Sequence, residues 1–440
     1  MVNHFINKTR DLSIPNSKKY NMKTVKGTRD LMPEDKRIKD FLIEKIRSVF
    51  ELYSFQPIET PALESWEVLS KKGAGGEEVI KEAYDFKDKA GRRIGLRYDL
   101  TVPLARVVAA NPNLILPFKR YQTGKIWRYD DVSKGRLREF SQMDIDIVGS
   151  ESMLADAEII SCVIDCFNKL GFKKFYIRLN NRKILTDLAK YAGVDEKKMP
   201  DVFRIIDKLE KVGIGEVKKQ MEEIASEDSI KKILNFIKIK GKNEDVLKKA
   251  EKIVKSEGID ELREILSYVK DDSKLRIDLS LARGLDYYTG PIYEVFADEE
   301  IGSIAAGGRY DKLIGLFLKR NVPATGISFG LDRIIEVMKQ RKMTNTDNQV
   351  RVFVAAVNDK VRDKALEIVQ MLRDKSLSCD YDLRSRSLSK QLEYASNMKI
   401  PYVVIVGERE LKEDSVKLRN METGKEELVK ISKLVKILAT

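Results

Sequence analysis

Hydrophobic and polar residues alternate along 122–129 and again along 138–148, and this period of two predicts two β-strands joined by a polar, basic loop. On the second strand Met143, Ile145 and Ile147 form an apolar face, and the residues between them point to the opposite side. That opposite side carries Arg138, Phe140, Gln142, Asp144 and Asp146. A half-buried hairpin with a solvated outer face is one interpretation. The mixture of arginine, ring, amide and carboxylates also suits a ligand that carries both phosphate and an amino group.

Helical periodicity marks two other segments before and after this hairpin. Between 34 and 53, apolar residues that include Phe41 recur at helical spacing, and Pro33 stands where a helix can begin. The segment 152–170 is equally amphipathic. The pattern therefore predicts two helices that pack against the sheet.

Changes in amino-acid composition along the chain divide it into domains. Residues 1–22 are polar and indicate a flexible N-terminal extension, and 23–340 form the first domain. Within that domain, 180–271 are dense in Lys and Glu and predict a helical insertion. A polar linker at 338–349 leads to 350–440, where strand-like and helical segments alternate as in a small α/β domain.

Three shorter stretches add candidate features. The glycine-rich loop at 71–80 is a mobile lid or simply a turn. Asp99 and Thr101 lie two residues apart, so an extended backbone would place both on one face, ahead of a helix predicted over 103–110. Gly307 and Gly308 allow a ligand to approach the backbone closely, or mark a β-bulge.

Composition narrows the class of protein. Lys and Arg total 82 against 69 Asp and Glu, a formal charge of +13 spread over the chain, which favours a polyanionic partner such as nucleic acid. The only histidine, His4, lies in the predicted extension, so catalysis by a histidine side chain is excluded from the core. Three cysteines, no signal peptide and no apolar stretch long enough for a bilayer predict a cytoplasmic protein with no membrane contact.

Three motifs resemble one enzyme family. R-x-D on the first strand, a G-R-x-R loop and F-x-Q on the second strand are similar to motif 2 of class II aminoacyl-tRNA synthetases. LARGLDYYTG at 281–290 and AAGGRYD at 305–311 resemble the histidyl-tRNA synthetase family more specifically. This resemblance implies an α+β catalytic domain built on an antiparallel sheet, with the helical insertion inside it, followed by an α/β anticodon-binding domain. It implies a histidine–tRNA ligase, which joins histidine to ATP as an adenylate and then transfers histidine to the 3' end of tRNA(His).

The resemblance also implies roles for individual residues at the ATP site. Arg128, Gln142 and Arg283 correspond to the catalytic residues, with Arg128 and Arg283 acting on the α-phosphate. The residues that would bind ATP are Arg128, Asp130, Arg136, Phe140 and Arg333. Mg²⁺ is expected to bridge ATP phosphates and to need few protein ligands, and no residue of the chain is assigned to it.

The resemblance also implies a second set of residues, which would bind histidine. Its α-amino group would meet Asp99 and Thr101, and its carboxylate region Gln142. The imidazole and its surroundings would be formed by Asp146, Arg283, Tyr287, Tyr288 and Tyr310. For Tyr287, simple core packing remains open as the alternative.

The resemblance has consequences for assembly and for competing interpretations. The helix at 34–53 and the extended segment after it resemble motif 1, which implies a homodimer. The main alternative is a catalytically silent paralogue that serves as a regulatory subunit of ATP phosphoribosyltransferase. A synthetase for another amino acid is a further alternative, which the motifs RGLDYY and GGRYD oppose.

Overall fold

The computed structural model describes residues 23–71, 80–133, 135–282, 287–297, 301–344 and 350–438. The chain divides into two units, Met1–Thr344 and Asn345–Thr440. The predicted extension at 1–22 and nearly all of the glycine-rich loop at 71–80 lie outside the described residues, so both remain expectations.

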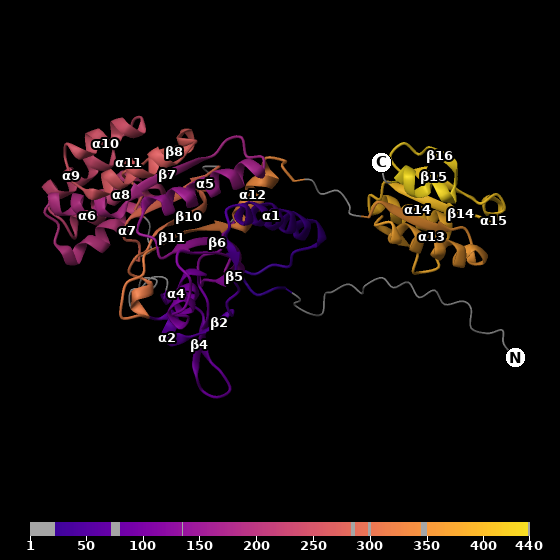
Figure 1. Cartoon of the computed structure of the whole chain (residues 1–440), viewed down its shortest axis with the longest axis horizontal. Helices are drawn as coiled ribbons and strands as arrows, with labels where there is room; N and C mark the ends of the chain where they lie inside the picture. Colours follow the sequence, from indigo (N-terminus) through magenta and orange to yellow (C-terminus); the bar gives the residue numbers. More distant parts are fainter. Residues whose placement is uncertain are drawn as a thin grey trace. The chain divides into compact units, whose positions relative to one another are not determined.

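An eight-stranded sheet forms the centre of the first unit (Figure 1). Its strands, in spatial order, are β1 (Gln56–Pro57), β5 (Phe118–Trp127), β6 (Glu139–Val148), β11 (Ala324–Gly330), β10 (Ser303–Arg309), β9 (Pro291–Phe296), β7 (Tyr176–Asn181) and β8 (Leu275–Ile277). Neighbours pair antiparallel, except for the outer pairs β1–β5 and β7–β8. The predicted antiparallel α+β catalytic fold is therefore confirmed.

The hairpin predicted from alternation is β5 and β6, which pair over ten residues from Phe118↔Val148 to Trp127↔Glu139. Met143, Ile145 and Ile147 are buried in the largest apolar core, as their shared parity predicted. The even-numbered residues of β6, which carry its polar side chains, face the other side of the sheet, because side chains alternate along a strand.

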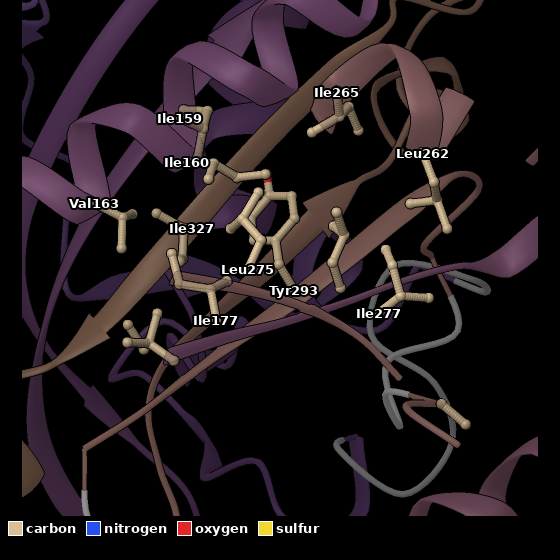
Figure 2. Close-up of a cluster of buried hydrophobic side chains, with 14 of the residues drawn as sticks. Ile159, Ile160, Val163, Ile177, Leu262, Ile265, Leu275, Ile277, Tyr293 and Ile327 are labelled. Carbon is tan, nitrogen blue, oxygen red and sulfur yellow. The ribbon is translucent and has the colours of Figure 1, made fainter. Parts of the chain in front are cut away.

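Helices cover the apolar face of this sheet. They are α1 (Pro33–Leu52), α5 (Met153–Lys169) and α12 (Leu331–Gln340), and both helices expected from periodicity are confirmed. Figure 2 shows Ile160 of α5 close to Ile327 of β11 and Tyr293 of β9, within the core between helix and sheet. One prediction for α1 is wrong: Phe41 belongs to the helical repeat but is 45 % exposed, and the ammonium of Lys45 lies 5.3 Å from its ring centroid.

Residues between β7 and β8 fold into helices gathered at one end of the first unit (Figure 1). These are α6 (Arg182–Tyr191), α7 (Met199–Asp207), α8 (Leu209–Glu222), α9 (Glu227–Ile237), α10 (Asn243–Glu251) and α11 (Glu257–Tyr268). Helix α11 packs on α5 and β7, and the buried residues of all six helices belong to the same core as the sheet. The predicted insertion is thus helical, and it is packed on the sheet rather than solvated on all sides.

A three-stranded sheet, with α2 (Trp66–Leu69) and α4 (Thr101–Ala110) beside it, lies near the polar side of the hairpin. Its antiparallel strands are β2 (Leu63–Ser65), β4 (Arg93–Leu96) and β3 (Asp85–Lys87). Helix α4 begins at Thr101, two residues before the predicted start at 103. The N-cap residue is Leu100, and the carboxylate of Asp99 just before it accepts the N–H of Val102 at 3.0 Å, which satisfies one free N–H group of the first turn.

The second unit is an α/β domain, as predicted. Its sheet contains β13 (Cys379–Tyr381), β12 (Val352–Ala356), β14 (Tyr402–Val406), β15 (Ser415–Asn420) and β16 (Glu426–Lys430). The first three strands are parallel and the last two add an antiparallel hairpin. Its helices are α13 (Arg362–Asp374), α14 (Leu388–Asn397), α15 (Glu408–Leu411) and α16 (Leu434–Leu438). Across the described ranges of both units, no helix is both long and apolar enough to cross a bilayer.

Candidate active site

A pocket with an empty volume of about 420 Å³ opens on the polar side of the central sheet. Of the residues expected to bind histidine or to act in catalysis, it is lined by Asp99, Thr101, Arg128, Gln142, Asp146, Tyr287, Tyr288 and Tyr310. They come from β5, β6, the start of α4 and the segments on either side of β9 and β10. The fold thus brings together residues more than 200 positions apart in the chain.

Three buried carboxylates give the pocket an acidic floor. Asp99, Asp144 and Asp146 are each at most 5 % exposed. Burial raises the pKa of Asp99 to about 6, and it raises the pKa of Asp144 to about 7 with a further contribution from the neighbouring charge of Asp146. One oxygen of Asp99, Oδ2, has no hydrogen-bond partner among the described residues. These groups suit a small ligand that brings positive charge and N–H donors.

Asp146 is held on both of its oxygens. The Nη2 of Arg120 lies 2.7 Å from Oδ2, and the hydroxyl of Tyr310 donates to Oδ1. Gly326, paired with Asp146 on β11, leaves the space that this carboxylate occupies, because a Cβ there would fall 2.1 Å from Oδ1. Burial raises the pKa of Asp146, and the Arg120 charge opposes that rise.

Aromatic rings form one wall of the pocket. The ring centroids of Tyr287 and Tyr288 are 4.8 Å apart, and those of Tyr287 and Tyr310 are 5.8 Å apart. Tyr287 packs in the apolar cluster beside the pocket and also lines it, so core packing and ligand contact are not exclusive alternatives for this residue.

Arg128, the residue after β5, and Gln142 of β6 both line the pocket, and Gln142 pairs with Gly124, four residues before Arg128. The Nε–H of Arg128 donates to the carbonyl of Tyr98 at 2.9 Å, which fixes the guanidinium while leaving its other donors for a ligand. The Oε1 of Gln142 is buried and has no partner in the described part of the chain. A fixed fork of donors beside a polar amide suits a phosphate joined to a carboxylate.

The remaining ATP candidates lie outside the lining of this pocket. Arg136 forms an ion pair with Asp130 within the loop between β5 and β6. Phe140 lies on β6 with its ring centroid 5.7 Å from the guanidinium carbon of Arg128. Arg333 is in the first turn of α12, which follows the pairing of Gly330 with Gln142, and it donates to the carbonyl of Ser303 at 2.7 Å. The fold therefore places Phe140 and Arg333 on adjoining elements beyond the Arg128 end of the pocket.

Arg283 is the one predicted site residue outside the described residues. Its described neighbours in the chain, Leu281 and Tyr287, both pack in the apolar cluster beside the pocket. The expected role of Arg283 therefore rests on its motif.

A network of buried hydrogen bonds ties the GGRYD segment to α5 and to the loop before it. Arg309 donates to Asp156 of α5 at 3.0 Å and to the carbonyl of Ser150 at 2.9 Å, and Thr325 donates to the same carboxylate at 2.7 Å. Because Arg309 is fixed to α5, the next residue, Tyr310, is held against Asp146. Gly307 lines the pocket, and the register shift in this strand lies between Ser303 and Ala305, not at the glycine pair.

The sequence interpretation placed Asp144 on the polar face of the second strand but gave it no role of its own, and it missed Arg120 and Ser328. Asp144 lies on the polar face of β6 and lines the pocket, where it accepts a hydrogen bond from Ser328. The alternation of β6 was sufficient to find Asp144. Nothing local distinguishes Arg120 from the other basic residues of its strand.

No group of three or more His, Cys, Asp or Glu side chains among the described residues is arranged to hold a metal ion. Of the three pocket aspartates, Asp146 pairs with Arg120 and accepts from Tyr310, Asp144 accepts from Ser328, and Asp99 accepts from the N–H of Val102.

Comparison with known proteins gives two family matches. Residues 27–334 match the model for histidyl-tRNA synthetase, and residues 351–440 match the model for the anticodon binding domain. Together they cover both units of the fold.

Individual relatives extend over nearly the whole chain. The histidine–tRNA ligase of Clostridium tetani is 39 % identical over 430 residues, covering 94 % of this chain and 97 % of that protein. The histidine–tRNA ligase of Aeropyrum pernix is 40 % identical over 421 residues, covering 93 % and 96 %. The crystal structure of histidyl-tRNA synthetase from Nostoc sp. PCC 7120 is 34 % identical, with a TM-score of 0.83 over 96 % of this chain and 99 % of that one.

Proposed function

The chain belongs to the histidyl-tRNA synthetase family, and we propose that it activates histidine with ATP and then transfers histidine to tRNA(His). The observation that carries this proposal is the single pocket in which Asp99, Asp146 and Arg128 converge. This lining supports the proposal because carboxylates suit ammonium and imidazole N–H groups, and a guanidinium fork suits phosphate.

The first step joins two bound molecules. An oxygen of the histidine carboxylate attacks the α-phosphorus of ATP, the P–O bond to the outer phosphates breaks, and pyrophosphate leaves. Arg128 neutralises charge on the α-phosphate, and Gln142 orients the attacking carboxylate. Most of the rate then comes from positioning and from fixed charge, as in other phosphoryl-group chemistry.

Recognition of histidine depends on complementary polar groups. The free Oδ2 of Asp99 and the hydroxyl of Thr101 bind the α-ammonium, while Asp146 accepts an N–H of the imidazole between the rings of Tyr288 and Tyr310. A ligand without that N–H leaves buried acceptors unpaired, which disfavours its binding.

The nucleotide lies beyond Arg128, with its adenine between Phe140 and Arg333 and its outer phosphates near Arg136. Arg136 pairs with Asp130 in the structure, so it must turn at least some of its N–H donors to the phosphate. A guanidinium has five such donors and can therefore bind phosphate while keeping part of its contact with Asp130. Mg²⁺ bound to the ATP phosphates supplies further charge neutralisation.

The direct test is ATP–pyrophosphate exchange with each amino acid in turn. Exchange should require histidine and magnesium. Equal exchange with threonine or proline would overturn the assignment of the substrate. The alternative, a silent regulatory paralogue, predicts no exchange with any amino acid; it is the less supported, because the chain matches ligases over 93–94 % of its length.

Asp144 should make histidine use depend on pH. Its carboxylate adds to the attraction for ammonium only when ionised, and its pKa is raised to about 7, so this attraction is present above pH 7 and is lost as the pH falls through 7. We expect kcat/KM for histidine to fall as the pH is lowered from 8 to 6. In Asp144→Asn the step near pH 7 should disappear, leaving the step of Asp99 near pH 6. An Asp144→Asn profile that matches the wild type would exclude this role.

Removing 350–440 should separate the two steps of the reaction. The second unit has apolar cores of its own, so the first unit retains its packing when the second is deleted. The truncated protein should still form the adenylate but charge tRNA poorly, because unpaired anticodon bases are read by a dedicated domain. Undiminished charging by the truncated protein would show that the domain is dispensable.

We also propose a cytoplasmic homodimer. Exposed apolar side chains along the first described segment and α1, namely Val25, Met32, Phe41 and Leu52, support an interface there. Light scattering should give about twice 50.4 kDa, and Phe41→Asp should lower that mass. Tyr191→Asp, at an equally exposed aromatic residue on α6, is the matched control. A wild type that is active as a monomer would contradict the proposal.

A further inference from the structure

The largest fully buried side chain in the described part of the protein belongs to a charged residue, Arg120. It lies on β5 directly opposite Asp146 of β6. Its Nη2 contacts the Asp146 carboxylate at 2.7 Å and the carbonyl of Leu100 at 3.2 Å, while Nε and Nη1 have no hydrogen-bond partner in the described residues. A buried guanidinium with two of its three nitrogens unpaired is poorly explained by packing alone, since an apolar side chain would avoid the desolvation.

The surroundings of Arg120 are strongly acidic. Asp99 approaches from the segment before α4, and Asp144 and Asp146 approach from β6. The charges of three carboxylates are thus gathered near one buried cation, and the one cation that lines the pocket, Arg128, is bonded to the carbonyl of Tyr98 instead. Arg120 does not line the pocket itself, so any effect on a ligand must pass through these carboxylates.

Asp146 is the carboxylate to which Arg120 is tied. The guanidinium of Arg120 forms an ion pair with Oδ2, which accepts no hydrogen bond from the described residues, and the hydroxyl of Tyr310 donates to Oδ1. Both oxygens therefore keep lone pairs for a ligand. Without the cation, burial and the neighbouring charge of Asp144 would both favour the neutral acid, which can no longer accept two hydrogen bonds at each oxygen.

We propose that Arg120 is a positioning residue for recognition of the histidine side chain, which holds Asp146 as an ionised acceptor at a fixed place for a ring N–H. This inference rests on the proposed function, because it presumes that the imidazole binds at Asp146. It predicts that Arg120 governs histidine affinity and its pH dependence, and that it has little influence on ATP.

The test compares Arg120→Met, Arg120→Lys, Asp146→Asn and the double variant Arg120→Met/Asp146→Asn. Arg120→Met should raise KM for histidine in the exchange reaction by about 10- to 100-fold, the size typical of removing a partner that orients a ligating group. KM for ATP should change by less than about twofold, since that binding does not involve Asp146. The acidic limb of kcat/KM for histidine should move to higher pH, because the charge of Arg120 opposes the raised pKa of both Asp144 and Asp146 and is then lost. Arg120→Lys should recover part of the loss, because it restores the charge without the fork.

The double variant distinguishes positioning from simple loss of stability. If Arg120 acts through Asp146, its removal should add almost nothing once Asp146 is already Asn, so the two effects should not multiply. The double variant also removes both charges together, which preserves folding if the single Arg120→Met protein unfolds. Arg106→Met is the matched control, because Arg106 forms a partly buried pair with Glu64 away from the pocket, and its histidine KM should stay at the wild-type value.

Two results would overturn the inference while leaving the proposed function intact. One is a folded Arg120→Met protein whose histidine KM and pH profile match the wild type. The other is a double variant whose loss equals the product of the two single losses. Failure of the proposed function itself would be seen separately, as a wild-type protein without histidine-dependent exchange.

Discussion

Replacement of Arg128 by alanine should slow adenylate formation by about 10²–10³-fold, the usual loss when one fixed donor to a developing charge is removed. The guanidinium lines the pocket and is held by the carbonyl of Tyr98 at 2.9 Å, so in the proposed mechanism we expect it to bind the α-phosphate without reorganising. Its contribution should be larger in the transition state than in bound ATP, because charge on the α-phosphate grows as the carboxylate attacks. Single-turnover measurement of adenylate formation therefore gives the expected loss directly.

Two further variants separate geometry from charge at Arg128. Arg128→Lys should recover only part of the rate, because one ammonium cannot bind the Tyr98 carbonyl and two phosphate oxygens in the same plane. Arg92→Ala removes an exposed arginine in the turn between β3 and β4 and should react at the wild-type rate. A folded Arg128→Ala protein with a normal rate would exclude Arg128 from the reaction.

Arg283→Ala should cause a loss of similar size in the same step, about 10²–10³-fold in the rate of adenylate formation. The motif around Arg283 resembles that of a family in which this arginine acts on the α-phosphate, and the described residue Tyr287, four positions later, lines the pocket. Apparent ATP affinity should change much less than the rate. Transfer of histidine from preformed adenylate to tRNA should suffer less, because the bond at phosphorus has already been made.

A different role for Arg283 has a different signature. If Arg283 only pairs with Asp286 and holds a turn, the alanine variant should lose thermal stability together with every activity. Melting curves recorded beside single-turnover kinetics distinguish the two roles. Arg283→Lys should rescue the rate partly when the role is catalytic, since its charge remains but its planar fork is lost.

Much of the site follows from local patterns in the chain. The alternation through β6 predicted which residues face the core and which face a ligand, and Gln142 and Asp146 do line the pocket. The expected class II fold agrees with the sheet, and the α/β character of 350–440 agrees with the second unit. These features can be predicted from sequence because a hydrophobic repeat of period two or 3.6 defines one buried face of a strand or helix. That face is defined regardless of which element packs on it.

Other features depend on parts of the chain that meet only after folding. Phe41 continues the helical repeat of α1 but is exposed, because the repeat does not show where the covering layer ends. Helix α4 starts earlier than its sequence indicated, and Asp99, which precedes it, accepts an N–H of the first turn while also lining the pocket. The raised pKa of Asp144 comes from burial and from Asp146, neither of which a local pattern specifies.

The sequence by itself determined the hairpin, the polar face of β6, the helical insertion and the family. The tertiary structure alone decided that Arg120 stands behind Asp146, that Tyr310 holds the other oxygen, and that Gly326 leaves room for both. The physical reason is strand register: the pairing of β5, β6 and β11 sets which side chains from distant segments meet, and a shift of one residue would turn each of them to the opposite face.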